Sequence, residues 1–226
     1  MPRLKSIFGL WSLIFSLIFV FWSSAFGLSS AQTRPEFLIT WRASNYAPSD
    51  FAGKILPIPG SALTAALELI DGGRIADLSQ TEIRWSVNNK IGRSGKGIKT
   101  FGFLIDQFER EDQLVTAEII NYKNANLSKT IIVPLGRSET TIKKIGRDLF
   151  AALPYFFNVA RPEQLIYRWR VNNQVPEGSP ANPWKLSLDT NPLPEGLSVN
   201  VSVEVVNTLN ELEQAIGNHS FVTIRI

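Results

Sequence analysis

One six-residue pattern occurs twice in this chain of 226 residues. The first copy is RWSVNN at residues 84–89, and the second is RWRVNN at residues 168–173, which lies 84 positions further on. This spacing is close to the length of one small β-sandwich domain. A sequence that repeats at a fixed period constrains the architecture before any secondary structure is assigned. The repeat therefore predicts two tandem copies of one domain.

A second pair of similar blocks follows in the same order. Residues 116–121 read TAEIIN and residues 202–207 read SVEVVN, at an offset of 86. The copies diverge between the blocks, with glycines in residues 92–97 and prolines in residues 176–183. Divergence in length and turn chemistry fits a loop between strands. Chance similarity of two β-rich stretches is the alternative, and the shared order argues against it.

Alternation of apolar and polar residues predicts strands in both halves, because every second side chain of a strand faces the same side. Pro, Gly and Asp clusters at residues 57–60, 71–73 and 95–97 predict the turns between them. Residues 210–217 are interpreted as one helical turn, with Asn210 as its N-cap and Gly217 beyond its end. The apolar strand positions are Phe37, Ile39, Trp41, Leu63, Ala65, Leu67, Leu69, Ile83, Trp85, Val87, Phe101, Phe103, Ile105, Tyr167, Trp169, Val171, Trp184, Leu186 and Leu188, with the stretches 115–120, 130–133, 149–157, 199–206 and 221–226.

The tryptophan block also resembles a known family. Residues 167–173, YRWRVNN, are similar to the Y-x-W-x-F-G-D stretch of PKD-type immunoglobulin-like domains, and residues 83–89 resemble it less closely. The resemblance implies that each tryptophan packs between two sheets and that the following turn closes a hairpin. Both copies have Asn-Asn in place of Gly-Asp, and asparagine also tolerates left-handed turn conformations. PKD-like domains serve as spacers, adhesion modules and scaffolds, so the resemblance selects no ligand.

These observations predict an all-β chain of two tandem immunoglobulin-like (PKD-like) β-sandwich domains behind an N-terminal hydrophobic helix. The predicted parts are a signal peptide or membrane anchor at 1–31, a sandwich at 35–135, a linker at 136–148 and a second sandwich at 149–226. The linker is polar and slightly basic. Because Thr141 and Ile142 are β-prone, part of it is also compatible with the opening strand of the second sandwich.

The first 31 residues have the pattern of an export signal. Arg3 and Lys5 precede an apolar run at residues 7–22, and Ser29 and Ala31 stand where a signal peptidase requires small residues. An uncleaved anchor is the alternative, since residues 7–28 are long enough to span a bilayer. Either way, the positive flank directs the rest of the chain outward. The opening stretch 39–43, with 57–61, is also similar to uncharacterised exported proteins of bacteria.

Composition excludes several partners and attachments. The chain has no cysteine, so it has neither disulfides nor a lipid-bearing cysteine, and its cores alone must hold it together. Its net charge is +3, of which Arg3 and Lys5 contribute two. The remainder is nearly neutral and has no basic stripe, so we expect no nucleic-acid partner.

The sequence predicts no catalytic, cofactor-binding or metal site. His219 is the only histidine, which argues against a typical zinc site and against a catalytic triad. Residues 92–97 lack the P-loop spacing and are expected to be a flexible hairpin loop. The acidic loop 106–112 contains Asp106, Glu109, Glu111 and Asp112. It lacks calcium-loop spacing and is interpreted as a solvated loop, with calcium binding left open.

Aromatic residues divide into core and contact candidates. Trp85 and Trp169 alternate in phase with apolar neighbours and are predicted to be buried. Trp41 and Trp184 are candidates for partly exposed contacts. Residues 155–157, YFF, are apolar on both faces of one strand, which predicts contact with the first domain or with another protein.

The sequence thus favours a non-catalytic, extracytoplasmic structural or interaction module of the bacterial cell envelope or surface. A protein partner in the envelope is expected, and the membrane is a partner if the N-terminal segment stays uncleaved. The alternative is a carbohydrate- or peptide-binding surface protein. An enzyme is the least favoured class, because no pair of acids or nucleophile with its base stands out.

Overall fold

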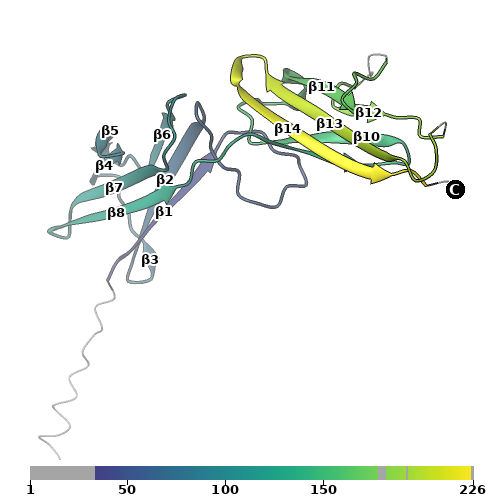
Figure 1. Cartoon of the computed structure of the whole chain (residues 1–226). Coiled ribbons are helices and arrows are strands. Elements are labelled where there is room, and N and C mark those ends of the chain that lie inside the picture. The colour runs from purple at the N-terminus through teal and green to yellow at the C-terminus, as the bar shows by residue number, and fades with distance from the viewer. Residues whose placement is uncertain (1–33, 178–181, 192, 225–226) are drawn as a thin grey trace, which may run out of the picture. The chain divides into compact units, whose positions relative to one another are not determined.

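Each half of the chain folds as two facing antiparallel β-sheets (Figure 1). The computed structural model describes residues 34–177, 182–191 and 193–224. Its described residues contain strands and one short 3-10 helix, Pro162–Gln164. The predicted signal or anchor at 1–31 lies outside the described residues.

The first sandwich is built around a central strand with strict alternation. Leu63, Ala65, Leu67 and Leu69 of β2 all face inward and are buried, while the residues between them are more exposed. One sheet joins β1, β2 and β6, with the short β3 on β2, and the other has the order β5-β4-β7-β8. The strands are β1 (Glu36–Ala43), β2 (Ala62–Asp71), β3 (Arg74–Ile75), β4 (Glu82–Val87), β5 (Lys90–Lys96), β6 (Thr100–Leu104), β7 (Gln113–Tyr122) and β8 (Ala125–Val133).

The second sandwich has its own core. Four inward valines of β13 are fully buried and pack with Phe150, Trp169 and Leu186 from the neighbouring strands. One sheet has the order β12-β10-β9 and the other has the order β11-β13-β14. The strands are β9 (Glu139–Lys144), β10 (Leu149–Tyr155), β11 (Leu165–Val171), β12 (Lys185–Ser187), β13 (Ser198–Asn207) and β14 (Asn210–Val222).

The two sandwiches have the same strand order. The sheet of β1, β2 and β6 corresponds to that of β9, β10 and β12, and β4, β7 and β8 correspond to β11, β13 and β14. In each sandwich, these three corresponding strands of one sheet face the three of the other in the arrangement of an immunoglobulin-like domain, and the first sandwich adds β3 and β5. The predicted all-β fold with two immunoglobulin-like sandwiches is confirmed.

The RWxV part of each first block lies in β4 or β11, and the second pair of blocks lies in their neighbours β7 and β13. The arginine of each first block therefore meets the glutamate of each second block. The Arg84 Nη1–Glu118 Oε2 and Arg168 Nη1–Glu204 Oε2 distances are both 3.2 Å. These pairs lie on the outer faces of the sheets, where such pairs contribute little to stability. They show instead that the two repeated sequence blocks lie on neighbouring, paired strands in each sandwich.

Each tryptophan fills the space between two sheets and satisfies its indole N–H. Trp85 and Trp169 are 0% and 5% exposed. Trp85 Nε1 donates to Ile98 O at 2.8 Å, and Trp169 Nε1 donates to Pro183 O at 2.9 Å. A buried indole N–H without an acceptor would cost free energy, so each connection must return over its tryptophan. The predicted core position of both tryptophans is confirmed.

The asparagine pairs form the predicted tight turns. Asn172 and Asn173 have φ values of 48° and 67°, and Asn88 and Asn89 have 49° and 64°. This left-handed region is accessible to asparagine at low cost. The first asparagine of each pair also binds across the sheet: Asn172 Oδ1 accepts from Asn200 N at 2.9 Å, as Asn88 Oδ1 does from Leu114 N.

Two predicted non-strand segments are strands. Residues 92–97, expected as a flexible loop, belong mostly to β5, which pairs with β4 along the edge of the sheet. Residues 210–217, expected as a helical turn, are the first part of β14, which pairs with β13. Alternate residues of β14 face inward, including Glu213, Gly217 and Phe221, and this period-2 pattern outweighs the isolated capping signal of Asn210.

The predicted linker also contains a strand. Residues 139–144 form β9, which pairs with β10 from Phe150–Lys144 to Tyr155–Glu139. Burial of Thr140 and Ile142 against the second core explains why this polar stretch is ordered as a strand. Only 134–138 connects the last strand of the first sandwich with the first strand of the second. The exact domain boundaries stay a prediction.

A glycine allows the sheets of the second sandwich to approach closely. A Cβ atom on Gly217 of β14 would lie 3.0 Å from Thr140 O and 3.1 Å from Thr140 Cγ2 of β9. Both distances are shorter than ordinary contacts, and a backbone oxygen has little freedom to move.

We expect Gly217→Ala to destabilise the protein by about 1–3 kcal/mol, because β9 and β14 must separate to admit the methyl group. Gly102→Ala is the matched control, since a Cβ at Gly102 of β6 would meet nothing closer than 3.9 Å. The control should change stability by less than about 1 kcal/mol, in the favourable direction. Urea unfolding followed by tryptophan fluorescence measures both, and equal effects would refute the close-approach explanation.

The paired asparagines allow a second comparison. Asn172→Gly keeps the left-handed turn but removes the bond to Asn200 N, and should cost about 1 kcal/mol. Asn173→Gly leaves that bond intact and should stay within about 0.5 kcal/mol of the parent. Thermal unfolding measured by circular dichroism separates the two variants. Indistinguishable midpoints would show that only the turn conformation matters.

Candidate functional site

The connection between β1 and β2, residues 44–61, reaches the second sandwich. Tyr46 N donates to Phe157 O at 2.8 Å, and Phe156 N donates to Tyr46 O at 2.7 Å. This pair of bonds forms an isolated antiparallel bridge between Tyr46 and Phe157. The Tyr46 side chain is half-buried and packs against the second core. The β1–β2 connection of the first sandwich therefore covers part of the hydrophobic core of the second.

Aromatic side chains reinforce this contact. The Phe51 ring lies 5.6 Å from the Tyr155 ring and 5.6 Å from the Phe156 ring, in edge-on arrangements at 66° and 76°. Edge-to-face pairs at this separation are favourable beyond the area that they bury. The apolar stretch 155–157 is thus covered by the first sandwich, which is one of the two contacts that its sequence predicted.

A polar network lies under these aromatic residues. Asn45 Nδ2 lies 2.8 Å from Phe156 O, 3.0 Å from Asn158 Oδ1 and 2.9 Å from Ser61 Oγ. Ser61 Oγ also donates to Asn158 Oδ1 at 2.8 Å, and Asn158 Nδ2 donates to Pro59 O at 3.0 Å. Asn45 and Ser61 are 6% and 1% exposed. Buried polar groups bonded to each other fix one relative arrangement far more specifically than apolar contact does.

Two groups at this contact lower the stability of the folded protein. Phe156 has a φ of 64°, which is rare for a bulky side chain. Asn45 Oδ1 is buried and has no hydrogen-bond partner among the described residues. Each costs on the order of 1–3 kcal/mol, so the surrounding contacts must hold both in place. Backbone strain of this kind is concentrated at functional sites of proteins.

Glu213 of β14 closes the network. It is 5% exposed, and its carboxylate accepts hydrogen bonds from Asn158 N, from Asn158 Nδ2 at 3.2 Å and from Asn207 Nδ2 at 3.1 Å. No salt bridge reaches it in the described part of the chain. Burial raises the pKa of Glu213, and the hydrogen bonds from Asn158 and Asn207 oppose that shift only in part. We call Asn45, Ser61, Asn158 and Glu213 the polar junction.

A hollow of about 340 Å³ opens beside Glu213. Ile58 and Pro59 come from the β1–β2 connection, and Leu212 comes from the β13–β14 hairpin. The charged residues that line it besides Glu213 are Glu109, Arg110 and Arg137. With two acids and two bases, the hollow has no net charge to select an anion or a cation.

The residues considered for chemistry do not converge on this site. His219 lies in β14, half-buried against the rings of Phe150 and Phe221. No group of three or more His, Asp or Glu side chains suited to a metal occurs in the described ranges. Trp41 is half-buried, with Lys54 Nζ 4.1 Å from its ring centre, and Trp184 is half-buried too.

The acidic loop binds its own backbone. Asp106 Oδ1 accepts from Phe108 N, and Glu109 Oε1 accepts from both Arg110 N and Glu111 N. Asp112 Oδ1 accepts from Leu135 N at 2.9 Å, which ties the loop to the end of β8. These carboxylates are thus engaged in shaping the loop, as the solvated-loop interpretation expects. Calcium binding there stays untested.

Sequence reasoning missed the polar junction. Asn45, Asn158 and Glu213 are far apart in the chain, and each has the appearance of an ordinary loop or surface residue. One signal was available: Asn158 directly follows the aromatic stretch 155–157, so a contact predicted there implies a polar partner beside it. Glu213 was assigned to a helical turn, and strand alternation would have placed it inward.

Comparison with known proteins adds only loose structural likenesses. No protein-family model matches the chain, and a comparison with curated proteins found no match. Fibronectin(III)-like modules of Clostridium thermocellum CbhA superpose with 10% identity and a TM-score of 0.29, covering 82% of this chain and 92% of that one. A C-terminal 282-residue fragment of intimin, solved with the intimin-binding domain of its translocated receptor, gives 11% identity and a TM-score of 0.29. That match covers 79% of this chain and 64% of the fragment, so the chain spans less than two thirds of the fragment's length.

At these TM-scores, the assignment of the class rests on strand order and register. These define a protein of two immunoglobulin-like β-sandwiches joined by a buried polar junction. Among the described residues, no helix has the length and apolar character needed to cross a membrane.

We expect Asn45→Ala to weaken the junction, because it removes the amide that holds Phe156 O, Asn158 and Ser61 together. The free energy of unfolding should fall by about 1–3 kcal/mol, and proteolysis within residues 44–61 should become faster. Asn218→Ala, at an exposed position on β14, is the control and should change stability by less than about 0.5 kcal/mol. Unchanged proteolysis in Asn45→Ala would show that the network does not hold the junction.

Proposed function

We propose that this protein is an exported, non-catalytic structural or interaction module of the bacterial cell envelope or surface, built from two PKD-type sandwiches. The observation that carries the proposal is the polar junction. A buried network that fixes one sandwich against the other is useful where a protein must hold two surfaces in a set relation, as a spacer or scaffold does.

Three further features support this function. The apolar segment at residues 7–28, with Arg3 and Lys5 before it, favours export. The sandwiches need no disulfide, because each has its own apolar core. Glu109 accepts hydrogen bonds from the backbone of its own loop, and His219 packs against the rings of Phe150 and Phe221.

A carbohydrate- or peptide-binding role finds less support. Sugar-binding modules present open aromatic faces, and Trp41 and Trp184 are both half-buried. Trp41 is also engaged by Lys54, whose Nζ donates to Trp41 O at 2.8 Å.

The test is to map the mature N-terminus by mass spectrometry and to crosslink the protein in its native envelope. We expect a start at Gln32 for a cleaved signal, or an intact N-terminus for an anchor, with reproducible envelope proteins crosslinked in either case. Asn45→Ala serves as the matched variant, because it should keep both sandwiches but lose crosslinks that depend on their fixed relation. A cytoplasmic protein with no envelope crosslinks would overturn the proposal.

A further inference from the structure

We propose that Glu213 makes the polar junction a pH-responsive latch, which holds the two sandwiches more firmly in acid than in neutral solution. The argument begins with the place of this carboxyl group. Glu213 is 5% exposed, and the hollow beside it is lined by Ile58 and Pro59 of the first sandwich. Separation of the sandwiches at this point would admit water to the carboxyl group.

The hydrogen bonds couple Glu213 to the first sandwich through one residue. Asn158 donates to the carboxylate with its backbone N–H and its side-chain amide. The same side chain binds Pro59 O, and its Oδ1 accepts from Ser61 Oγ and lies 3.0 Å from Asn45 Nδ2. The protonation state of Glu213 therefore acts directly on Asn158, the residue that joins the two sandwiches.

The charged form of Glu213 is compensated only in part, by hydrogen bonds from Asn158 and Asn207. The donors around it are neutral amides, and no basic side chain forms a salt bridge with it among residues that the structure describes. The charged side chains that share its hollow are Glu109 and Arg110 from the β6–β7 loop and Arg137 from the connection 134–138. Arg110 Nη1 donates instead to Glu109 O at 2.9 Å.

The direction of the pH effect follows from the linkage between proton binding to Glu213 and closure of the junction. In the closed junction, burial raises the pKa of Glu213 above its ordinary value, whereas the open junction exposes it to water. The closed state therefore binds the proton more tightly than the open state does. Closure is favoured fully at a pH below the ordinary glutamate pKa, and this advantage is lost as the pH rises through the raised pKa.

The lack of cysteine permits a clean distance measurement. Spin labels on Ser128→Cys of β8 and Ser187→Cys of β12, both exposed positions, report the separation of the sandwiches in the full chain. Pulsed dipolar spectroscopy then gives the distance distribution across a series from about pH 4.5 to about pH 8. We expect the distribution to narrow as the pH falls.

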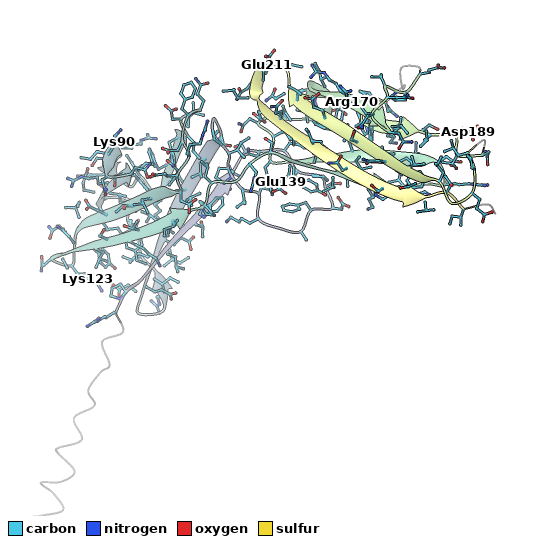
Figure 2. The ribbon with its side chains drawn as sticks, viewed as in Figure 1. Lys90, Lys123, Glu139, Arg170, Asp189 and Glu211 are labelled. Atoms are coloured by element: carbon cyan, nitrogen blue, oxygen red, sulfur yellow. The ribbon has the colours of Figure 1, made fainter. Side chains whose placement is uncertain are left out.

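Three variants assign the change to Glu213. Glu213→Gln should give a narrow distribution at every pH, since a neutral side chain stands at that position throughout. Glu211→Gln is the matched control from the same hairpin, because Glu211 is exposed at the β13–β14 turn and should leave the pH response intact (Figure 2). His219→Gln, further along β14, should leave it intact as well.

Three results would overturn the latch. One is a distribution in the parent that does not change with pH, and this result stands whether or not Glu213→Gln folds. The second is a pH response that persists in Glu213→Gln, and the third is one that disappears in Glu211→Gln. None of these results bears on envelope crosslinking, so failure of the latch would leave the proposed function standing.

Discussion

Both sandwiches depend on a buried indole N–H that must find an acceptor. A tryptophan is large enough to span the gap between two sheets, but its nitrogen cannot be left unbonded in an apolar core. Trp85 and Trp169 meet this condition in the same way, with a carbonyl of the connection that returns across the sandwich. Strand order, the position of that connection and the closure of the core over the tryptophan are linked by this one bond.

The polar junction rests on different physics. Apolar contact between Phe51 and the stretch 155–157 gives attraction without a defined register, because rings can slide over one another. The amide of Asn45 and the side chain of Asn158 add direction to that attraction. The strained backbone of Phe156 and the buried carboxylate of Glu213 lie at the same contact. The hydrogen bonds that fix the two sandwiches therefore lie beside groups that lower the stability of the protein.

The fold, strand β14 and the polar junction differ in how far the sequence could predict them. The fold was predictable, because the repeated blocks lie on neighbouring strands in both sandwiches. Arg84 pairs with Glu118 across these strands, as Arg168 does with Glu204. Strand β14 was mistaken in part for a helical turn, since Asn210 and Gly217 carry capping signals that short windows cannot weigh against pairing with β13. The junction left only one indirect signal, the aromatic stretch directly before Asn158, because a contact between Asn45 and Asn158 leaves no local pattern.

The Tyr46–Phe157 bridge has a consequence for how the chain can be divided. Residue 46 is synthesised long before residue 157, yet its side chain packs on the core that residue 157 helps to build. A fragment cut after the first sandwich would expose an aromatic loop with no surface to cover, and the remaining fragment would lack part of its wall. The two halves share a strand order, but they are not interchangeable units, and duplication of the second half alone would reproduce an incomplete domain.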